Sequence, residues 1–275
     1  MDMLGNTIIE QILKPGRTWD LVLLVLTFAA TLYLLDRVAK GKPLPRIRRI
    51  AALEAIAEGV GRSVEIRKPV HFSFGAYGAD VYGDSVSQTL ASLGVLSHTA
   101  GLSARLGARF IFHLPQNPEA IPIIEGTILE AFTREGKPEA FNKSQDMRFY
   151  GTGTMIHTTG MSQSFMSEGV GLKIMVGRQY TTVYPALENA KLQGAIVIGG
   201  TARWTAQYIF ALTCDYMFIG EELFAGGAVV TGNPYMISSL AAEELDKVFS
   251  IAFVFLGLIL SLLLGVTGFT NIAKL

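Results

Sequence analysis

Two long, almost uniformly apolar runs constrain this chain more than any other feature of its sequence. The first covers residues 19–35, and when it is extended to Val38 it measures about 30 Å as a helix, which is the thickness of the hydrocarbon layer of a bilayer. The second covers residues 248–269 and contains no charged residue. No small-residue cleavage site follows the first run, so it does not look like a signal peptide. We therefore predict transmembrane helices at residues 19–38 and 248–269.

The cations beside the first run predict its orientation. Lys14 and Arg17 precede the run, whereas a denser group follows it: Arg37, Lys40, Lys42, Arg46, Arg48 and Arg49. Because positive charge stays on the cytoplasmic side, we expect residues 43–245 to form a cytoplasmic domain at the cell membrane, with both termini outside. Residues 270–275 are then a short outer tail. Residues 1–18 are predicted to be an extracytoplasmic interfacial segment, or alternatively a peptide that docks on a neighbouring subunit.

Composition excludes several classes of protein. The chain has 23 Lys and Arg against 23 Asp and Glu, so its formal net charge is zero, and half of its residues are apolar. A polybasic nucleic-acid binder is excluded by this balance, and disorder is excluded by the apolar content. The single cysteine, Cys214, rules out an internal disulfide and multi-cysteine zinc modules. The predicted partner is the lipid bilayer, with no nucleic acid.

Between the two runs, short apolar strands alternate with helices. The pattern predicts strands near 69–74, 108–114, 147–151, 172–177, 195–200 and 215–220, and helices near 46–65, 86–106, 118–136, 154–169, 181–193 and 202–213. Strands without polar alternation are buried on both faces, as in parallel sheets. We therefore predict an α/β domain with a doubly wound, mostly parallel sheet of about six strands, of the Rossmann-like kind.

Glycines cluster where the predicted strands end, which is where doubly wound sheets bind ligands. The candidate residues of an anion or ligand crevice are Gly75, Gly78, Gly151, Gly153, Gly199, Gly200, Thr201 and Arg203. Residues 199–203 are the strongest of these, because glycine amides, a hydroxyl and a guanidinium together suit a phosphate or carboxylate. The alternative is that the glycines only make tight turns. The Gly151–Gly153 pair lacks the third glycine of a dinucleotide fingerprint, so no cofactor is predicted.

The sequence offers no recognisable catalytic motif and no metal site. His71 lies within a predicted strand and His113 nearer the end of one, where a histidine more often packs than reacts. His98 and His157 lie in helices without a metal-ligand partner at the required spacing. Whether the chain is an enzyme stays open, with the balance against it.

Residues 223–240 are apolar but interrupted by Gly226, Gly227, Gly232 and Pro234. We expect this segment to form a hairpin or an extended flap rather than a regular helix. An exposed apolar ribbon of this kind favours self-association.

The block RIRRIAALEAIAEGVGRSVEIRKPVHFSFG, the turn GAIVIGGTARW and the segment YMFIGEELFAGGA resemble an uncharacterised family of bacterial and archaeal membrane-anchored, Rossmann-like proteins, known mainly as a domain of unknown function. The resemblance implies fold and topology but no activity.

The residues themselves leave two functions as expectations. The first is a structural or scaffolding membrane protein that forms a homo-oligomer or joins a larger membrane complex. The second is a membrane-tethered binder or enzyme for an anionic or nucleotide-like small molecule.

Overall fold

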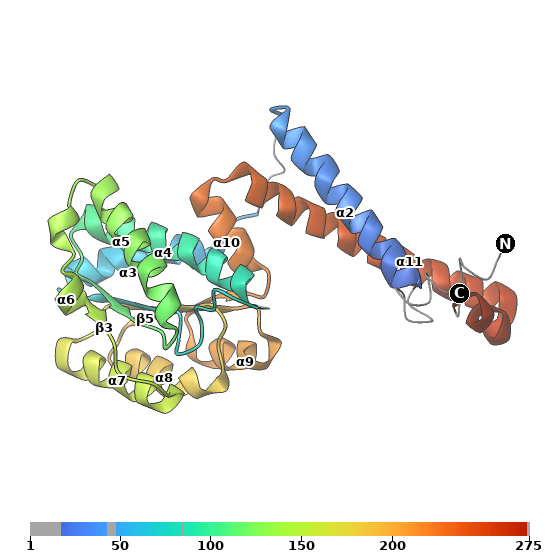
Figure 1. The fold of residues 1–275 in the computed structure, drawn as a ribbon. Helices are drawn as coiled ribbons and strands as arrows, with labels where there is room; N and C mark the ends of the chain where they lie inside the picture. Colours follow the sequence, from blue (N-terminus) through green and yellow to red (C-terminus); the bar gives the residue numbers. More distant parts are fainter. Residues whose placement is uncertain (1–17, 43–47, 84, 274–275) are drawn as a thin grey trace. The chain divides into compact units, whose positions relative to one another are not determined.

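The computed structural model describes residues 18–42, 48–83 and 85–273 (Figure 1). The chain divides into two compact units, which are considered separately. The α/β unit comprises residues 47–232, and the helical unit comprises the residues on either side of it. The predicted interfacial segment lies outside the described residues, apart from Thr18.

A six-stranded parallel sheet forms the centre of the α/β unit. Its strands are β1 Val70–Ser73, β2 Phe110–His113, β3 Met147–Arg148, β4 Leu172–Val176, β5 Ile196–Thr201 and β6 Tyr216–Ile219. Their order in the sheet is β3-β2-β1-β4-β5-β6, and every neighbouring pair is parallel. This is the strand order of a doubly wound dinucleotide-binding fold. The predicted parallel sheet of about six strands is confirmed.

Helices cover both faces of the sheet (Figure 1). One layer contains α3 Ala51–Glu65, α4 Val86–Leu106 and α5 Ile121–Arg134, and the other contains α7 Thr154–Glu168, α8 Tyr184–Leu192 and α9 Trp204–Thr213. The remaining elements of the unit are α6 Lys143–Asp146, α10 Glu222–Thr231 and the 3-10 turns η1 Pro118–Ala120, η2 Pro138–Ala140 and η3 Thr181–Val183. The predicted helix 46–65 is shorter than expected, because its regular part begins at Ala51.

The two faces of the sheet carry different chemistry. Phe72, Phe110 and Phe112 pack together in the core beneath α3, α4 and α5. Because strand side chains alternate, the neighbouring residues face the other layer, where Met161 and Phe165 of α7 belong to a second core. Those neighbours include His71 and Lys173, which form a register pair between β1 and β4. The α7 side of the sheet is therefore partly polar although it is buried.

The prediction of a hairpin or flap for residues 223–240 is wrong, because this segment is helical. It contains α10 and the first turns of α11 Pro234–Ala273. A Cβ atom on Gly227 would lie 2.7 Å from the carbonyl oxygen of Ala91, so this glycine lets α10 approach α4 closely. Gly232 then ends α10 in the left-handed conformation, with φ of 61°. The glycines that suggested an irregular ribbon serve packing and helix termination.

The helical unit consists of α2 Thr18–Ala39 and α11, which lie side by side (Figure 1). Among the described residues, one helix is long and apolar enough to cross a membrane, and it is the segment Leu21–Ala39 of α2. The hydroxyl of Thr27 in α2 donates a hydrogen bond to the Asp246 carboxylate in α11, at 2.6 Å. The second predicted span falls within α11 and stays a prediction.

Candidate functional site

The eight residues predicted to form a ligand crevice lie at the same edge of the sheet. Gly75 and Gly78 follow β1, Gly151 and Gly153 follow β3, and the remaining four belong to the end of β5 and the turn after it. Parallel strands end at one edge, so this arrangement follows directly from the topology. Whether a ligand binds there stays a prediction.

Protein atoms closely surround several of these glycines. A Cβ atom on Gly199 would lie 2.0 Å from the Phe210 ring, and one on Gly75 would lie 2.2 Å from the side-chain oxygen of Gln179. The amide of Ala202 donates to the side-chain oxygen of Gln88 at 3.2 Å, and that of Arg203 donates to the Thr201 hydroxyl at 3.1 Å. The close contacts give Gly75 and Gly199 a role in packing. The two hydrogen bonds occupy the amides of Ala202 and Arg203, so these amides are not free to bind a ligand.

A charged network lies beside these glycines. The Asp80 carboxylate accepts hydrogen bonds from Ser85 at 2.6 Å, Arg178 at 2.7 Å and Asn117 at 2.8 Å. Burial acts to raise the pKa of Asp80, but these hydrogen bonds and the Arg178 charge outweigh it and hold the pKa below its usual value. Ser85 directly precedes α4, but its hydroxyl makes no capping hydrogen bond to the helix and donates to Asp80 instead.

Two guanidinium groups meet one aromatic ring at this edge. The Arg203 guanidinium carbon lies 4.3 Å from the centre of the Tyr180 ring, and that of Arg178 lies 5.6 Å from it. Within the described part of the chain, Arg203 forms no ion pair with a carboxylate. The predicted residue Arg203 is thus the member of the crevice that retains a cationic group for an anionic ligand.

A second cluster lies beneath α7 and was not predicted as a site. It contains three of the four histidines of the chain, His71, His113 and His157, together with Tyr150 and Lys173. Strand alternation directs His71 and Lys173 to the α7 side of the sheet, and α7 itself contributes His157. The three histidines and Lys173 are all buried. The signal in the sequence was a lysine within the otherwise apolar strand LKIMV.

Hydrogen bonds in this cluster have a fixed direction. The Gly169 carbonyl can only accept, so His71 donates to it through Nε2 at 2.9 Å. His71 Nδ1 must then accept from His113 Nε2 at 2.9 Å, and His113 Nδ1 accepts from the Tyr150 hydroxyl at 2.9 Å. The chain Tyr150–His113–His71–Gly169 therefore requires neutral imidazoles with one defined tautomer each.

Burial explains why these imidazoles stay neutral. It lowers the pKa of His71 to about 3, with a further contribution from the nearby Lys173. The same two causes lower the pKa of His157 to about 4, and burial lowers that of His113 well below its usual value. Burial also raises the pKa of Tyr150, so its hydroxyl keeps the proton that the chain needs.

Lys173 has no carboxylate in contact with it in the described part of the chain. Its amine lies 3.6 Å from the sulfur of Met161 and 5.5 Å from the centre of the Phe165 ring. Because the side chain is completely buried, the pKa of the amine falls well below its usual value, which favours the uncharged form.

His157 also has an unused polar atom. Its Nε2 lies 3.4 Å from the hydroxyl of Ser73, and this hydroxyl accepts a hydrogen bond from the Gly75 amide. Its Nδ1 is buried without a hydrogen-bond partner among the described residues. Buried polar atoms usually have partners, so this ring nitrogen is unusual.

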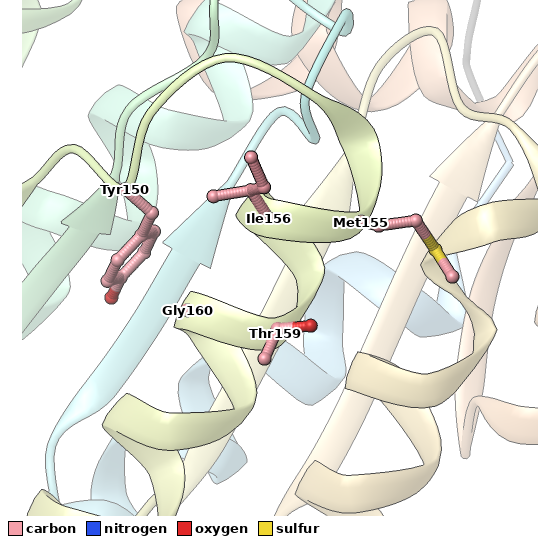
Figure 2. A pocket seen from close by; sticks show the side chains of 5 residues that line it. All are labelled: Tyr150, Met155, Ile156, Thr159 and Gly160. Carbon is pink, nitrogen blue, oxygen red and sulfur yellow. The ribbon is translucent and has the colours of Figure 1, made fainter.

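An open pocket of about 410 Å³ lies above this cluster, lined by Tyr150, Met155, Ile156, Thr159 and Gly160 (Figure 2). The last four residues belong to the first turns of α7, and Tyr150 precedes the helix. The Tyr150 ring rests on Gly160, where a Cβ atom would lie 2.3 Å from the ring. The ring also stacks on His113 and meets His157 edge-on. Tyr150 therefore lines the pocket and contacts the buried histidines at the same time.

No group of three or more potential metal ligands occurs among the described residues. The lone thiol, Cys214, is mostly buried, and burial raises its pKa to about 12. It therefore stays protonated at neutral pH and is unsuited to nucleophilic chemistry.

Comparisons with curated proteins and with solved structures give no match. The family described as domain of unknown function DUF6754 matches residues 9–272, which is nearly the whole chain, including both apolar runs. The chain therefore belongs to the DUF6754 family.

Proposed function

We propose that this protein is a membrane-anchored scaffold whose α/β unit associates with other copies of itself. The observation that carries the proposal is an apolar stripe on the outer face of α9. Trp204, Tyr208 and Leu212 follow one another at intervals of four residues, so they lie on one side of the helix. Trp204 is 80% exposed and Leu212 is 75% exposed. Such side chains are typical of protein–protein contacts when they cluster.

Two features favour a second copy of this chain as the partner. The formal net charge is zero, so copies do not repel one another at long range. Anchoring through α2 would confine all copies to one plane and raise their local concentration. Tryptophan and tyrosine are also enriched among the residues that dominate binding energy at interfaces.

The test is the mass of the full-length protein in detergent, measured by light scattering at several concentrations. The wild type is expected to form oligomers, and the double variant Trp204→Ser/Leu212→Ser is expected to weaken the association by about thirtyfold or more. The matched control is Ile123→Ser, which changes an exposed apolar residue of α5 on the opposite layer. A monomeric wild type at micromolar concentration, or equal loss in the control, would remove the support for this function.

A second candidate function is the binding of a nucleotide-like anion at the edge of the sheet. It is favoured by the Arg203 guanidinium, which stacks on Tyr180 without a carboxylate partner among the described residues. Adenosine monophosphate and a sugar phosphate are suitable probes. We expect them to raise the thermal unfolding temperature of the wild type, and the variant Arg203→Gln to lose this effect. No shift with either probe would count against this function.

A further inference from the structure

The buried cluster beneath α7 combines two polar groups that have no adequate partner. The Lys173 amine contacts a thioether and an aromatic ring, and His157 Nδ1 has no hydrogen-bond partner within the part of the chain that the structure describes. Both side chains belong to the layer between α7 and the sheet, because Lys173 lies in β4 beside His71 and His157 is a buried residue of α7 whose pKa the Lys173 charge lowers. A buried, unpaired amine costs folding free energy, and proteins retain such costs mainly at functional sites.

We propose that the layer between α7 and strands β1 and β4 is a binding site for a small oxyanion, with Lys173 and His157 as its ligand-binding groups. The ligand class is a compact carboxylate or phosphate, which offers several acceptor oxygens. This inference is independent of self-association through α9. It concerns a different site from the Arg203 edge.

The charge of the surrounding groups suits an anion. The titratable groups on which the Lys173 charge acts are His71 of β1, His113 of β2 and His157 of α7. Tyr150 bonds to His113 and is itself acted on by the Glu168 carboxylate, but within the described residues no carboxylate contacts Lys173. Arg109 and Arg148 act from further away, and both are already ion-paired with Glu168. An oxyanion would supply the counter-charge that this basic layer lacks, and it would restore the ammonium form of Lys173.

The hydrogen-bond chain determines which groups of the cluster are free to bind an anion. His71 and His113 use both ring nitrogens within the chain, so neither offers a free donor. Lys173 and His157 are therefore the groups of the cluster that remain available to bind an anion and to take up a proton. Ser73 lies 3.4 Å from His157 Nε2, and when its hydroxyl donates to that atom, the proton of the neutral imidazole is on Nδ1.

Tyr150 is the residue that connects the cluster with the surface. It lines the open pocket, and its ring contacts both His113 and His157. Helix α7 is flanked by Gly153, with φ of 120°, and by Gly169, with φ of 78°. Glycine tolerates these angles without strain.

The experiment measures thermal unfolding of the full-length protein in detergent with acetate, inorganic phosphate or chloride at equal ionic strength. Acetate or phosphate is expected to raise the unfolding temperature in a saturable way, and chloride is expected not to. Binding takes up a proton at Lys173, so the shift is expected to be larger at pH 6 than at pH 8. The two oxyanions distinguish a carboxylate site from a phosphate site.

The decisive variant is Lys173→Met, which has a similar length and no charge to desolvate. It is expected to unfold at a higher temperature than the wild type in buffer and to lose the response to both oxyanions. The exposed lysine variant Lys191→Met and the edge variant Arg203→Gln are expected to keep that response. An unchanged response in Lys173→Met, or the absence of any oxyanion effect in the wild type, would overturn the proposal. If only Arg203→Gln lost the rise in unfolding temperature with the oxyanions, the anion would be assigned to the edge of the sheet instead.

Discussion

At the scale of residues, the buried bases link folding to pH. A histidine that is neutral in the folded state and has its usual pKa in the unfolded state binds fewer protons when folded. The pKa of His71 is lowered from 6.5 to about 3, and that of His157 from 6.5 to about 4. The contribution of these neutral histidines to the free energy of unfolding is therefore fully present above pH 6.5, and it is lost as the pH falls from 6.5 toward 4.

We expect the variant His157→Gln to flatten this pH dependence. Each unit of pKa difference corresponds to about 1.4 kcal/mol, so the wild type should lose on the order of 2–3 kcal/mol more than the variant across this range. Urea unfolding between pH 7 and pH 4, followed by circular dichroism, measures the difference. His98→Gln is the control, because His98 lies on α4 outside the cluster and is less buried. Parallel pH profiles for the wild type and His157→Gln would contradict this account.

At the scale of elements, glycine sets how closely two helices pack. Helices α4 and α10 meet at Gly94 and Gly227, and a Cβ atom on Gly94 would lie 2.9 Å from the Gly227 carbonyl oxygen. The contact atoms belong to backbone, which cannot turn aside as a flexible side chain can. The pair therefore fixes the distance between these helices.

The variant Gly227→Ala is expected to destabilise the protein by about 1–3 kcal/mol, because the added methyl group forces α10 away from α4. The matched control is Gly126→Ala in α5, where nothing lies within 4 Å of the added atom. Alanine loses less entropy than glycine in a helix, so this control should gain about 0.5–1 kcal/mol. Urea midpoints of the two variants test both signs, and equal effects would show that α4 and α10 do not pack as described.

At the scale of the whole molecule, α2 is the one described helix that is long and apolar enough to cross a membrane. Its segment Leu21–Ala39 is apolar, and none of it is buried within the structure. A helix that exposes so much apolar surface requires lipid or another protein to cover it. The polar contact between Thr27 and Asp246 also ties α2 to α11 at a point where the helix is otherwise apolar.

We expect the full-length protein to stay in the membrane pellet after washing with alkaline carbonate, because spanning helices resist extraction whereas surface-bound proteins do not. The variant Phe28→Arg/Leu32→Arg should shift a substantial fraction to the supernatant, since each arginine near the centre of the span costs about 2.5–3.5 kcal/mol of insertion. Protease added to sealed cells tests the orientation, and it should spare residues 43–245. Digestion of that region would reverse the predicted sidedness.

Local patterns were enough to predict most of the α/β unit. Short apolar strands such as 172–176 and 196–201 carry no polar alternation, which indicates burial on both faces and hence a parallel sheet. Local patterns were not enough to predict residues 223–240, because glycines at these positions are compatible both with a loop and with a helix that packs closely on another helix. Only the position of α4 decides between the two. The strand-end glycines were likewise found by pattern, but their neighbours were not, since Phe210 comes from the helix after Gly199 and Gln179 lies far from Gly75 in the sequence.

The sequence by itself determined the order of strands and helices and the two apolar runs, because these depend on the periodicity of neighbouring residues. Only the tertiary structure brought His71, His113, His157, Tyr150 and Lys173 together, since these side chains come from three strands, a loop and a helix. Their protonation states follow from that burial, as desolvation depends on every element packed around them. In the sequence, Lys173 is simply one lysine in an apolar strand. It becomes a candidate site only in the folded structure, where no carboxylate of the described residues contacts it.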